Sequence, residues 1–217
     1  MKRFFTLLSL ALIAMLTVNP QCAEAKSPKK QGIITVKDGQ FMRNGKPYYF
    51  VGTNFWYGAI LGSEGEGGNR ERLIKELDFM KANGIDNLRI LIGGEGENGL
   101  LGKIEPNLQS EPGVYNDAVL EGLDFLMMEL GKRNMTAVLY FNNAWEWSGG
   151  YTQYVAWANN TPVLVPRVDG WFSYNAFAGE FVRNERAKEI FYDHVRYIVS
   201  RTNRYTGIKY IDDPAIF

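Results

Sequence analysis

The sequence has few of the side chains that metal and thiol chemistry require. Its 217 residues include one cysteine, Cys22, and one histidine, His194. They contain no metal-ligand spacing, nucleotide-binding glycine loop or serine-nucleophile elbow. An excess of either charge is also lacking, because 24 basic residues balance 24 acidic ones. Nucleic acid and anionic membranes are therefore not expected partners.

Long hydrophobic runs are lacking as well, except at the start of the sequence. There a basic beginning precedes an apolar run over residues 4–18, and small residues follow before Lys26. The run is shorter than the roughly 20 residues of a membrane-spanning helix, and the pattern is typical of a secretory signal peptide cleaved near Ala25. We therefore predict a secreted or periplasmic protein without a membrane span. Lipid attachment at Cys22 is the less favoured alternative.

The remaining residues are expected to form one globular unit. We assign residues 1–25 to the signal peptide, 26–31 to a flexible lead-in and 32–217 to the fold. A hydrophobic content of 46% is enough for a sizeable core. Cleavage near residue 25 would leave no cysteine, and therefore no disulfide.

Short apolar segments alternate with helical patterns after residue 32. Asp38-Gly39 and Asn44-Gly45 predict two tight hairpin turns. Apolar runs predict strands, and apolar residues at helical spacing predict helices. The predicted strands cover residues 48–52, 87–92 and 136–141. Asn69 and Asn184 are expected to cap the first and third predicted helices, and the second is expected to begin at about Asp117. A long loop rich in aromatic residues is expected between residues 142 and 184.

This alternation predicts an α/β fold. Right-handed βαβ units with loops elaborated after the strands favour a (β/α)8 barrel, also called a TIM barrel. Such a barrel typically needs about 250 residues, whereas 217 minus 25 leaves 192 here. Three strand–helix units are visible, so we expect a barrel truncated after about three units.

Tryptophans are concentrated at one place in this pattern. The third predicted strand is followed by amides, aromatic residues and glycines, and the predicted helices contain no tryptophan. All five tryptophans follow the first or the third predicted strand: Trp56, Trp145, Trp147, Trp157 and Trp171. Flat indole rings offer apolar faces to sugar rings, and neighbouring amides bind hydroxyl groups. The pattern indicates carbohydrate binding, although a core role is more common for any single tryptophan.

Three polar residues are further candidates for a site. Arg89 alternates with the apolar residues of its strand, which directs it into the barrel, where a guanidinium needs an acidic partner. It either orients a catalytic carboxylate or forms a structural ion pair. Asn142 and Asn143 stand at the carboxyl end of the third strand, where barrel enzymes place working groups. A loop amide that caps the backbone is an equally weighted interpretation of each.

The acidic residues near this end do not identify a catalytic pair. Six of them lie there: Glu64, Glu66, Glu95, Glu97, Glu146 and Asp169. Glycine-rich segments surround the first four and are typical of solvated mobile loops, and nothing places two carboxyl groups at the separation that a glycosidase needs. His194 lies on the apolar side of a helix, so we expect a packing residue and not a base or ligand.

Four segments carry a resemblance to a known family. They are the run Gly-Thr-Asn-Phe-Trp-Tyr at residues 52–57, Leu-Arg-Ile at 88–90, residues 142–157, and the closing run over residues 201–217. With these segments, the chain from about residue 32 to residue 217 resembles the amino-terminal half of glycoside hydrolase family 5 enzymes. The branch it resembles is that of the secreted endo-β-1,4-mannanases.

The resemblance implies retaining hydrolysis of internal β-1,4 bonds in a β-mannan, without a metal or organic cofactor. It implies that Trp56 contacts the substrate and that Asn143 and Trp145 line the sugar cleft. The position of Asn142 and Trp147 after the third strand makes them further candidate substrate-binding residues. Arg89 would support the nucleophile. The acid/base glutamate of the family stands in an Asn-Glu-Pro motif on the fourth strand and the nucleophile on the seventh, so both are expected beyond Phe217. A fragment without them is expected to be inactive.

Two alternatives remain open. The first is a cellulase or another β-glucanase of the same family, because residues that distinguish axial from equatorial hydroxyls lie partly outside this sequence. The second is a non-catalytic carbohydrate-binding protein whose aromatic loops bind glycan.

Overall fold

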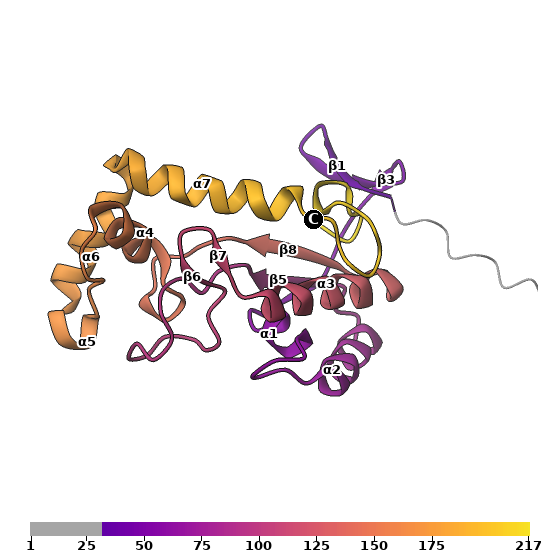
Figure 1. The fold of residues 1–217 in the computed structure, drawn as a ribbon. Coiled ribbons are helices and arrows are strands. Elements are labelled where there is room, and N and C mark those ends of the chain that lie inside the picture. The colour runs from indigo at the N-terminus through magenta and orange to yellow at the C-terminus, as the bar shows by residue number, and fades with distance from the viewer. Residues whose placement is uncertain (1–31) are drawn as a thin grey trace, which may run out of the picture. The chain divides into compact units, whose positions relative to one another are not determined.

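A computed structural model describes residues 32–217 (Figure 1). The predicted signal peptide, residues 1–25, and the predicted lead-in, residues 26–31, lie outside the described residues. Within residues 32–217, no helix is both long and apolar enough to cross a membrane.

Two tight turns shape the first strands, as predicted. Strands β1 (Ile34–Lys37), β2 (Gln40–Arg43) and β3 (Lys46–Pro47) form an antiparallel sheet. Asp38 and Gly39 between β1 and β2 have φ angles of 51° and 74°, and the Asn44-Gly45 pair repeats these values. Positive φ at both central residues is the geometry of a type I′ turn, which asparagine, aspartate and glycine tolerate best.

Three parallel strands form the centre of the fold. They are β4 (Gly52–Asn54), β5 (Asn87–Leu91) and β8 (Thr136–Tyr140), in the order β4-β5-β8. In their register Asn54 pairs with Arg89, and Arg89 pairs with Val138. The last residues extend this arrangement, because Ile216 forms a parallel bridge with Ala137 of β8. The carboxyl ends of the strands therefore meet at one edge of the sheet.

The first parallel strand is shorter than predicted. The prediction covered residues 48–52, but β4 begins at Gly52, and the residues before it link the small antiparallel sheet to the parallel one. The backbone N–H of Tyr48 donates a hydrogen bond of 2.8 Å to the carbonyl of Phe41 in β2. The carbonyl of Val51 accepts a hydrogen bond of 3.0 Å from the N–H of Asp86, which directly precedes β5. The apolar side chains of this link are largely exposed. The apolar run at residues 48–52 therefore did not mark a buried strand.

Three long helices follow the parallel strands, as predicted. They are α2 (Arg70–Ala82), α3 (Asp117–Lys132) and α7 (Glu185–Ser200). An asparagine caps each, because the side-chain oxygens of Asn69, Asn116 and Asn184 accept hydrogen bonds from backbone N–H groups of the first turn. These bonds satisfy donors that the helix itself leaves free.

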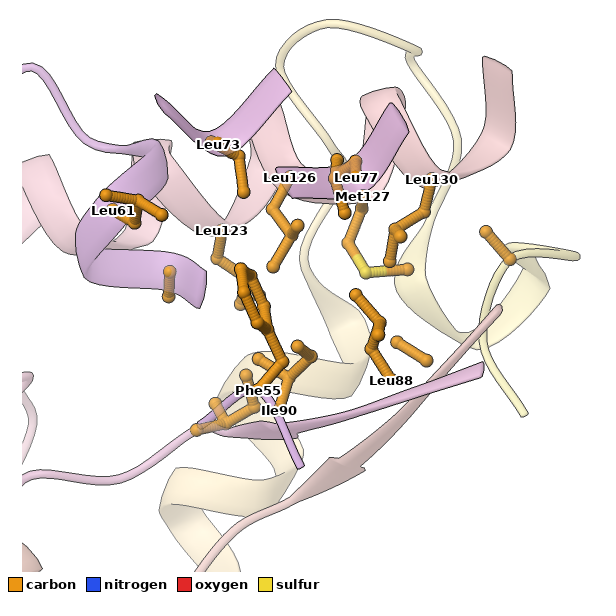
Figure 2. Close-up of a cluster of buried hydrophobic side chains, with 14 of the residues drawn as sticks. Phe55, Leu61, Leu73, Leu77, Leu88, Ile90, Leu123, Leu126, Met127 and Leu130 are labelled. Atoms are coloured by element: carbon orange, nitrogen blue, oxygen red, sulfur yellow. The ribbon is translucent and has the colours of Figure 1, made fainter. Parts of the chain in front are cut away.

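The main core lies between the parallel strands and the helices on one of their faces (Figure 2). Leu88 and Ile90 of β5 point toward leucines of α2 and α3, and all of these side chains are buried. Helix α1 (Gly58–Gly62) packs against α3 at Gly122. A Cβ atom on Gly122 would lie 2.2 Å from the carbonyl oxygen of Ala59. Only glycine permits this approach, which brings α1 over the sheet.

The segment between β8 and α7 is helical, so the predicted long loop is wrong. It contains η1 (Glu146–Ser148), α4 (Gly150–Asn159), α5 (Pro166–Asp169), α6 (Trp171–Gly179) and η2 (Glu180–Arg183). Tyr154 and Val155 of α4 are buried against Ala187 and Ile190 of α7 in a second apolar cluster. Apolar residues occur all along α4 and α6, so no one-sided helical pattern revealed them. Trp157 and Trp171 consequently lie in helices, against expectation.

Three short elements complete the described part of the chain. Strands β6 (Gln109–Glu111) and β7 (Val114–Tyr115) form a hairpin between β5 and α3, and η3 (Tyr210–Asp212) follows α7. The order β4-α2-β5-α3-β8-α7 gives three strand–helix units. The α/β class and the three units are as predicted.

Candidate functional site

Two tryptophans from distant parts of the sequence meet beyond the carboxyl ends of the parallel strands. Trp56 follows β4, and Trp147 lies in η1 after β8. Their ring centroids are 5.2 Å apart at an interplanar angle of 61°. Both rings are half-buried. The structure thus brings together two of the predicted substrate-binding residues.

Trp145 lies two residues from Trp147 and forms a second ring pair. Its centroid is 6.0 Å from that of Trp171, at an angle of 81°. Trp145 is 59% exposed and Trp171 is 46% exposed. Trp157 is separate from both pairs and contacts Tyr154 in the second apolar cluster. Four of the five tryptophans therefore lie in two pairs that one short segment connects.

The two predicted asparagines have different surroundings. The side-chain oxygen of Asn143 accepts hydrogen bonds from the N–H of Trp145 in 2.8 Å and from the hydroxyl of Ser148 in 2.9 Å. This asparagine therefore fixes the turn that carries the tryptophans. The amide nitrogen and oxygen of Asn142 are buried and have no hydrogen-bond partner among the residues that the structure describes. Because an unpaired buried amide is costly, Asn142 is the better candidate for a group that binds a ligand.

Glu146 lies between Trp145 and Trp147 in the sequence. One of its carboxylate oxygens, Oε2, is buried and has no hydrogen-bond partner in the described part of the chain. The neighbouring Tyr174 has a raised pKa, chiefly because it is buried, and the negative charge of Glu146 adds to this effect. The segment thus combines aromatic rings with buried polar atoms that lack a hydrogen-bond partner among residues 32–217.

Arg89 points away from the helices, as predicted, but its neighbour is aromatic. Its guanidinium carbon lies 3.4 Å from the centroid of the Tyr140 ring. The register explains this contact, because Tyr140 stands diagonally across from Arg89 on the same face of the sheet. The expected acidic partner is not found among residues 32–217, where no ion pair of Arg89 occurs.

Glu95 does not lie in a solvated loop, so that expectation is wrong. The residue is only 2% exposed. Its carboxylate accepts hydrogen bonds from the hydroxyl of Tyr154 in 3.0 Å and from the backbone N–H groups of Gly150 and Gly94 in 3.2 and 3.3 Å. Burial raises its pKa to about 7, although these hydrogen bonds act in the opposite direction. The exposed second half of the glycine-rich segment, residues 97–99, agrees with the prediction.

Glycine makes this arrangement possible. Gly149 has a φ of +84°, and a Cβ atom there would lie 2.3 Å from the carbonyl oxygen of Glu95. Lys103 adds a further link, because its ammonium donates to that carbonyl in 3.2 Å and to the side-chain oxygen of Gln153 in 2.7 Å. Burial lowers the pKa of Lys103 to about 8. The loop after β5 thus packs against the start of α4, which directly follows the segment that carries Trp145 and Trp147. The adjacent glycines at residues 149 and 150 were the sequence signal for this contact.

His194 is a packing residue, as predicted. Its Nε2 donates to the carbonyl of Ile92 in 2.9 Å, and its Nδ1 accepts from the hydroxyl of Tyr115 in 3.2 Å. Burial lowers its pKa to about 4, so the ring is neutral at neutral pH. In the described part of the chain, no group of three or more histidine, cysteine, aspartate or glutamate side chains could hold a metal ion.

Comparison with known proteins agrees with this arrangement of strands and helices. The family profile described as GH family 5 beta-mannosidase-like matches residues 31–217. The chain belongs to glycoside hydrolase family 5. Among curated relatives in this family, mannan endo-1,4-beta-mannosidase 1 of Solanum lycopersicum is 31% identical over 85% of this chain and 42% of its own length. Mannan endo-1,4-beta-mannosidase 3 of Arabidopsis thaliana is 30% identical over 94% and 45%.

Solved structures of the family give the same result for the fold. A glycoside hydrolase family 5 mannosidase from Rhizomucor miehei, in complex with mannosyl-fructose, matches with a TM-score of 0.80 and 34% identity. The match covers 85% of this chain and 47% of that chain. The architecture is therefore that of family 5 (β/α)8 glycosidases, of which residues 32–217 form a part. The chain spans less than half the length of the relatives that it matches.

Proposed function

We propose that the protein is a mannan endo-1,4-β-mannosidase and that residues 32–217 supply one side of its substrate cleft. The observation that carries this proposal is the contact between Trp56 and Trp147 beyond the carboxyl ends of β4 and β8. This edge is where barrel enzymes bind substrate, and paired indoles suit the apolar faces of sugar rings. The names of the curated relatives support a β-mannan as the polymer.

The proposed reaction is retaining hydrolysis. One glutamate protonates the leaving glycosidic oxygen, the other attacks the anomeric carbon, and water then hydrolyses the glycosyl-enzyme. We assign neither role to Glu95 or Glu146. Glu95 is held by backbone N–H groups of its own loop and of α4, away from solvent, and the family's Asn-Glu-Pro motif does not occur in this sequence. The catalytic carboxylates are proposed to belong to a part of the protein outside these 217 residues.

Arg89 has the role of a positioning residue in this proposal. Its guanidinium stands on the face of the sheet opposite the helices, and the Tyr140 ring holds it there without neutralising its charge. A carboxylate on a neighbouring strand would therefore meet a cation that is already oriented. Such a partner stays ionised at lower pH, as a nucleophile must.

Retardation in native gels that contain galactomannan tests the binding part of the proposal. We expect the dilute purified chain to migrate more slowly with galactomannan and less so with carboxymethyl cellulose. Trp147→Ala should abolish the effect, whereas Tyr192→Ala, at an exposed aromatic residue on α7, should not. No retardation by galactomannan would contradict the proposal, and stronger retardation by the cellulose derivative would favour a β-glucanase.

Hydrolysis assays test where the catalytic carboxylates lie. The 217-residue chain is expected to release no reducing ends from galactomannan, whereas protein that extends to the length of the relatives is expected to hydrolyse it. Hydrolysis by the 217-residue chain that Glu146→Gln or Glu95→Gln abolishes would show that these residues are catalytic after all.

Secretion is a separate proposal. It rests on the apolar run and the small residues near Ala25, which lie outside the described residues. Mass spectrometry of the exported protein should give a chain that begins at Lys26. A chain that begins at Met1, or one that carries a lipid on Cys22, would contradict cleavage after Ala25.

A further inference from the structure

We propose that helix α6 adds an outer sugar-binding site to the cleft, formed by Trp171 and Trp145. The inference rests on the proposed function, because it concerns how the same cleft binds a β-1,4-linked chain. Trp56 and Trp147 would hold inner sugar units, and the outer pair would hold a unit further along the polymer. The site would therefore favour long chains over short oligosaccharides.

The outer rings are exposed and yet fixed in place. They meet nearly at right angles, with centroids 6.0 Å apart, and Trp171 also contacts Tyr174 one helical turn later at 5.7 Å. The hydroxyl of Tyr174 donates to the carbonyl of Ala144 in 3.2 Å and accepts from the hydroxyl of Thr152 in 3.2 Å. Because Ala144 directly precedes Trp145, this bond ties α6 to the segment that carries the partner ring.

The outer pair is continuous with the inner one. Trp145 and Trp147 are two residues apart, so their Cα atoms are separated by at most about 7 Å. Asn143 accepts from the N–H of Trp145 and from the hydroxyl of Ser148, which fixes both tryptophans relative to each other. A ligand that extends from one pair can therefore reach the other without rearrangement of the loop, which lowers the entropic cost of binding.

The chemistry of this surface matches a neutral polysaccharide. Residues 171–179 contain no charged side chain, so the helix offers nothing that attracts a charged partner. The exposed rings of Trp145 and Trp171 add an apolar platform to this uncharged helix. Hydroxyl groups around an apolar ring face are the features of a hexose unit that such a surface recognises.

Calorimetry with mannobiose and mannohexaose tests the inference on dilute protein. Trp171→Ala is expected to weaken mannohexaose binding about tenfold and to leave mannobiose binding unchanged. Phe172→Ala is the matched control, because Phe172 lies next to Trp171 in α6, is 90% exposed and belongs to neither tryptophan pair. It should change neither affinity. Trp147→Ala should weaken the binding of both sugars, and Trp171→Phe should keep part of the mannohexaose affinity.

The outcomes separate this inference from the proposed function. If Trp147→Ala weakens both sugars but Trp171→Ala weakens neither, the outer site is wrong and the cleft remains. If the unsubstituted chain binds neither sugar, the proposed function itself fails. Equal losses from Phe172→Ala and Trp171→Ala would indicate a general apolar surface and contradict the outer site. The outer site would also be contradicted if Trp171→Ala abolished self-association in size-exclusion chromatography but left the affinity for mannohexaose unchanged.

Discussion

At the scale of single residues, burial shifts the ionisation of Glu95 and His194 in opposite directions. The pKa of Glu95 is raised from 4.5 to about 7, and that of His194 is lowered from 6.5 to about 4. The contribution of Glu95 to stability is fully present below pH 4.5 and is lost as the pH rises to about 7. His194 has the opposite effect, because it destabilises the fold at acidic pH and ceases to do so as the pH rises toward 6.5.

Replacing Glu95 should separate these two effects. The difference between pKa values of 4.5 and about 7 corresponds to about 3 kcal/mol. The difference in free energy of unfolding between Glu95→Gln and the unsubstituted chain should shift in favour of the variant by about that amount from about pH 5 to about pH 7.5. The free energy of unfolding of Glu95→Gln itself should rise over this range because of His194. Lys103, with a pKa of about 8, titrates mainly above this window. Guanidinium unfolding at both pH values measures the change.

The control for this experiment lies two residues along the same loop. Glu97 is exposed, so Glu97→Gln should not give the gain in stability that is expected of Glu95→Gln between about pH 5 and about pH 7.5. An identical response of both variants would show that Glu95 is not the buried group described above.

Gly149 offers a second test at the residue scale. Gly149→Ala should lower the free energy of unfolding by about 3 kcal/mol, because it combines a positive φ with a Cβ atom 2.3 Å from the Glu95 carbonyl. Gly84→Ala is the control: Gly84 directly follows the C-cap residue of α2, has a φ of +81° and has no described atom within 4 Å of the added Cβ, so this change should cost about 1 kcal/mol. Similar losses in urea unfolding would contradict the close approach of these two segments.

At the scale of elements, the helix caps give the clearest prediction. Asn116 accepts from the N–H groups of Ala118 and Val119 at the start of α3. Asn116→Ala should therefore lower the free energy of unfolding by about 1 kcal/mol, whereas Asn116→Asp should keep the cap. Denaturant unfolding of both variants tests this, and an equal loss in both would contradict a capping role.

The elements also show which parts of the fold a sequence can predict. Local signals sufficed where one residue pattern determined the structure: the turns at Asp38 and Asn44, and the asparagine caps of α2 and α7, were predicted and confirmed. The helices between residues 142 and 184 were missed because they are apolar on several sides. Glu95 was misplaced because its burial depends on Gly149 and Tyr154, more than 50 residues away.

At the scale of the whole molecule, the parallel sheet has an open side. Among the described residues β4 pairs with β5 alone, and a pocket of about 640 Å³ lies between β4 and α2. Phe79, which lines this pocket, is 69% exposed. In a closed barrel another strand and helix would cover such an edge.

Residues 26–217 on their own are therefore expected to be poorly stable or to self-associate. Light scattering during size-exclusion chromatography and thermal unfolding measure both properties. Phe79→Lys should reduce self-association because it places a charge in the open pocket. A monomeric chain with a cooperative thermal transition would contradict this expectation.

Oxidative footprinting of the five tryptophans in the presence of mannohexaose shows which indoles the sugar covers, because mass spectrometry reports each indole separately. If the tryptophans beyond the strand ends form one glycan-binding surface, the sugar should protect Trp56, Trp145, Trp147 and Trp171 from oxidation. Trp157, which packs against Tyr154 in the second cluster, should react as it does without sugar. Unchanged oxidation of the first four residues would show that they do not form a shared glycan-binding surface.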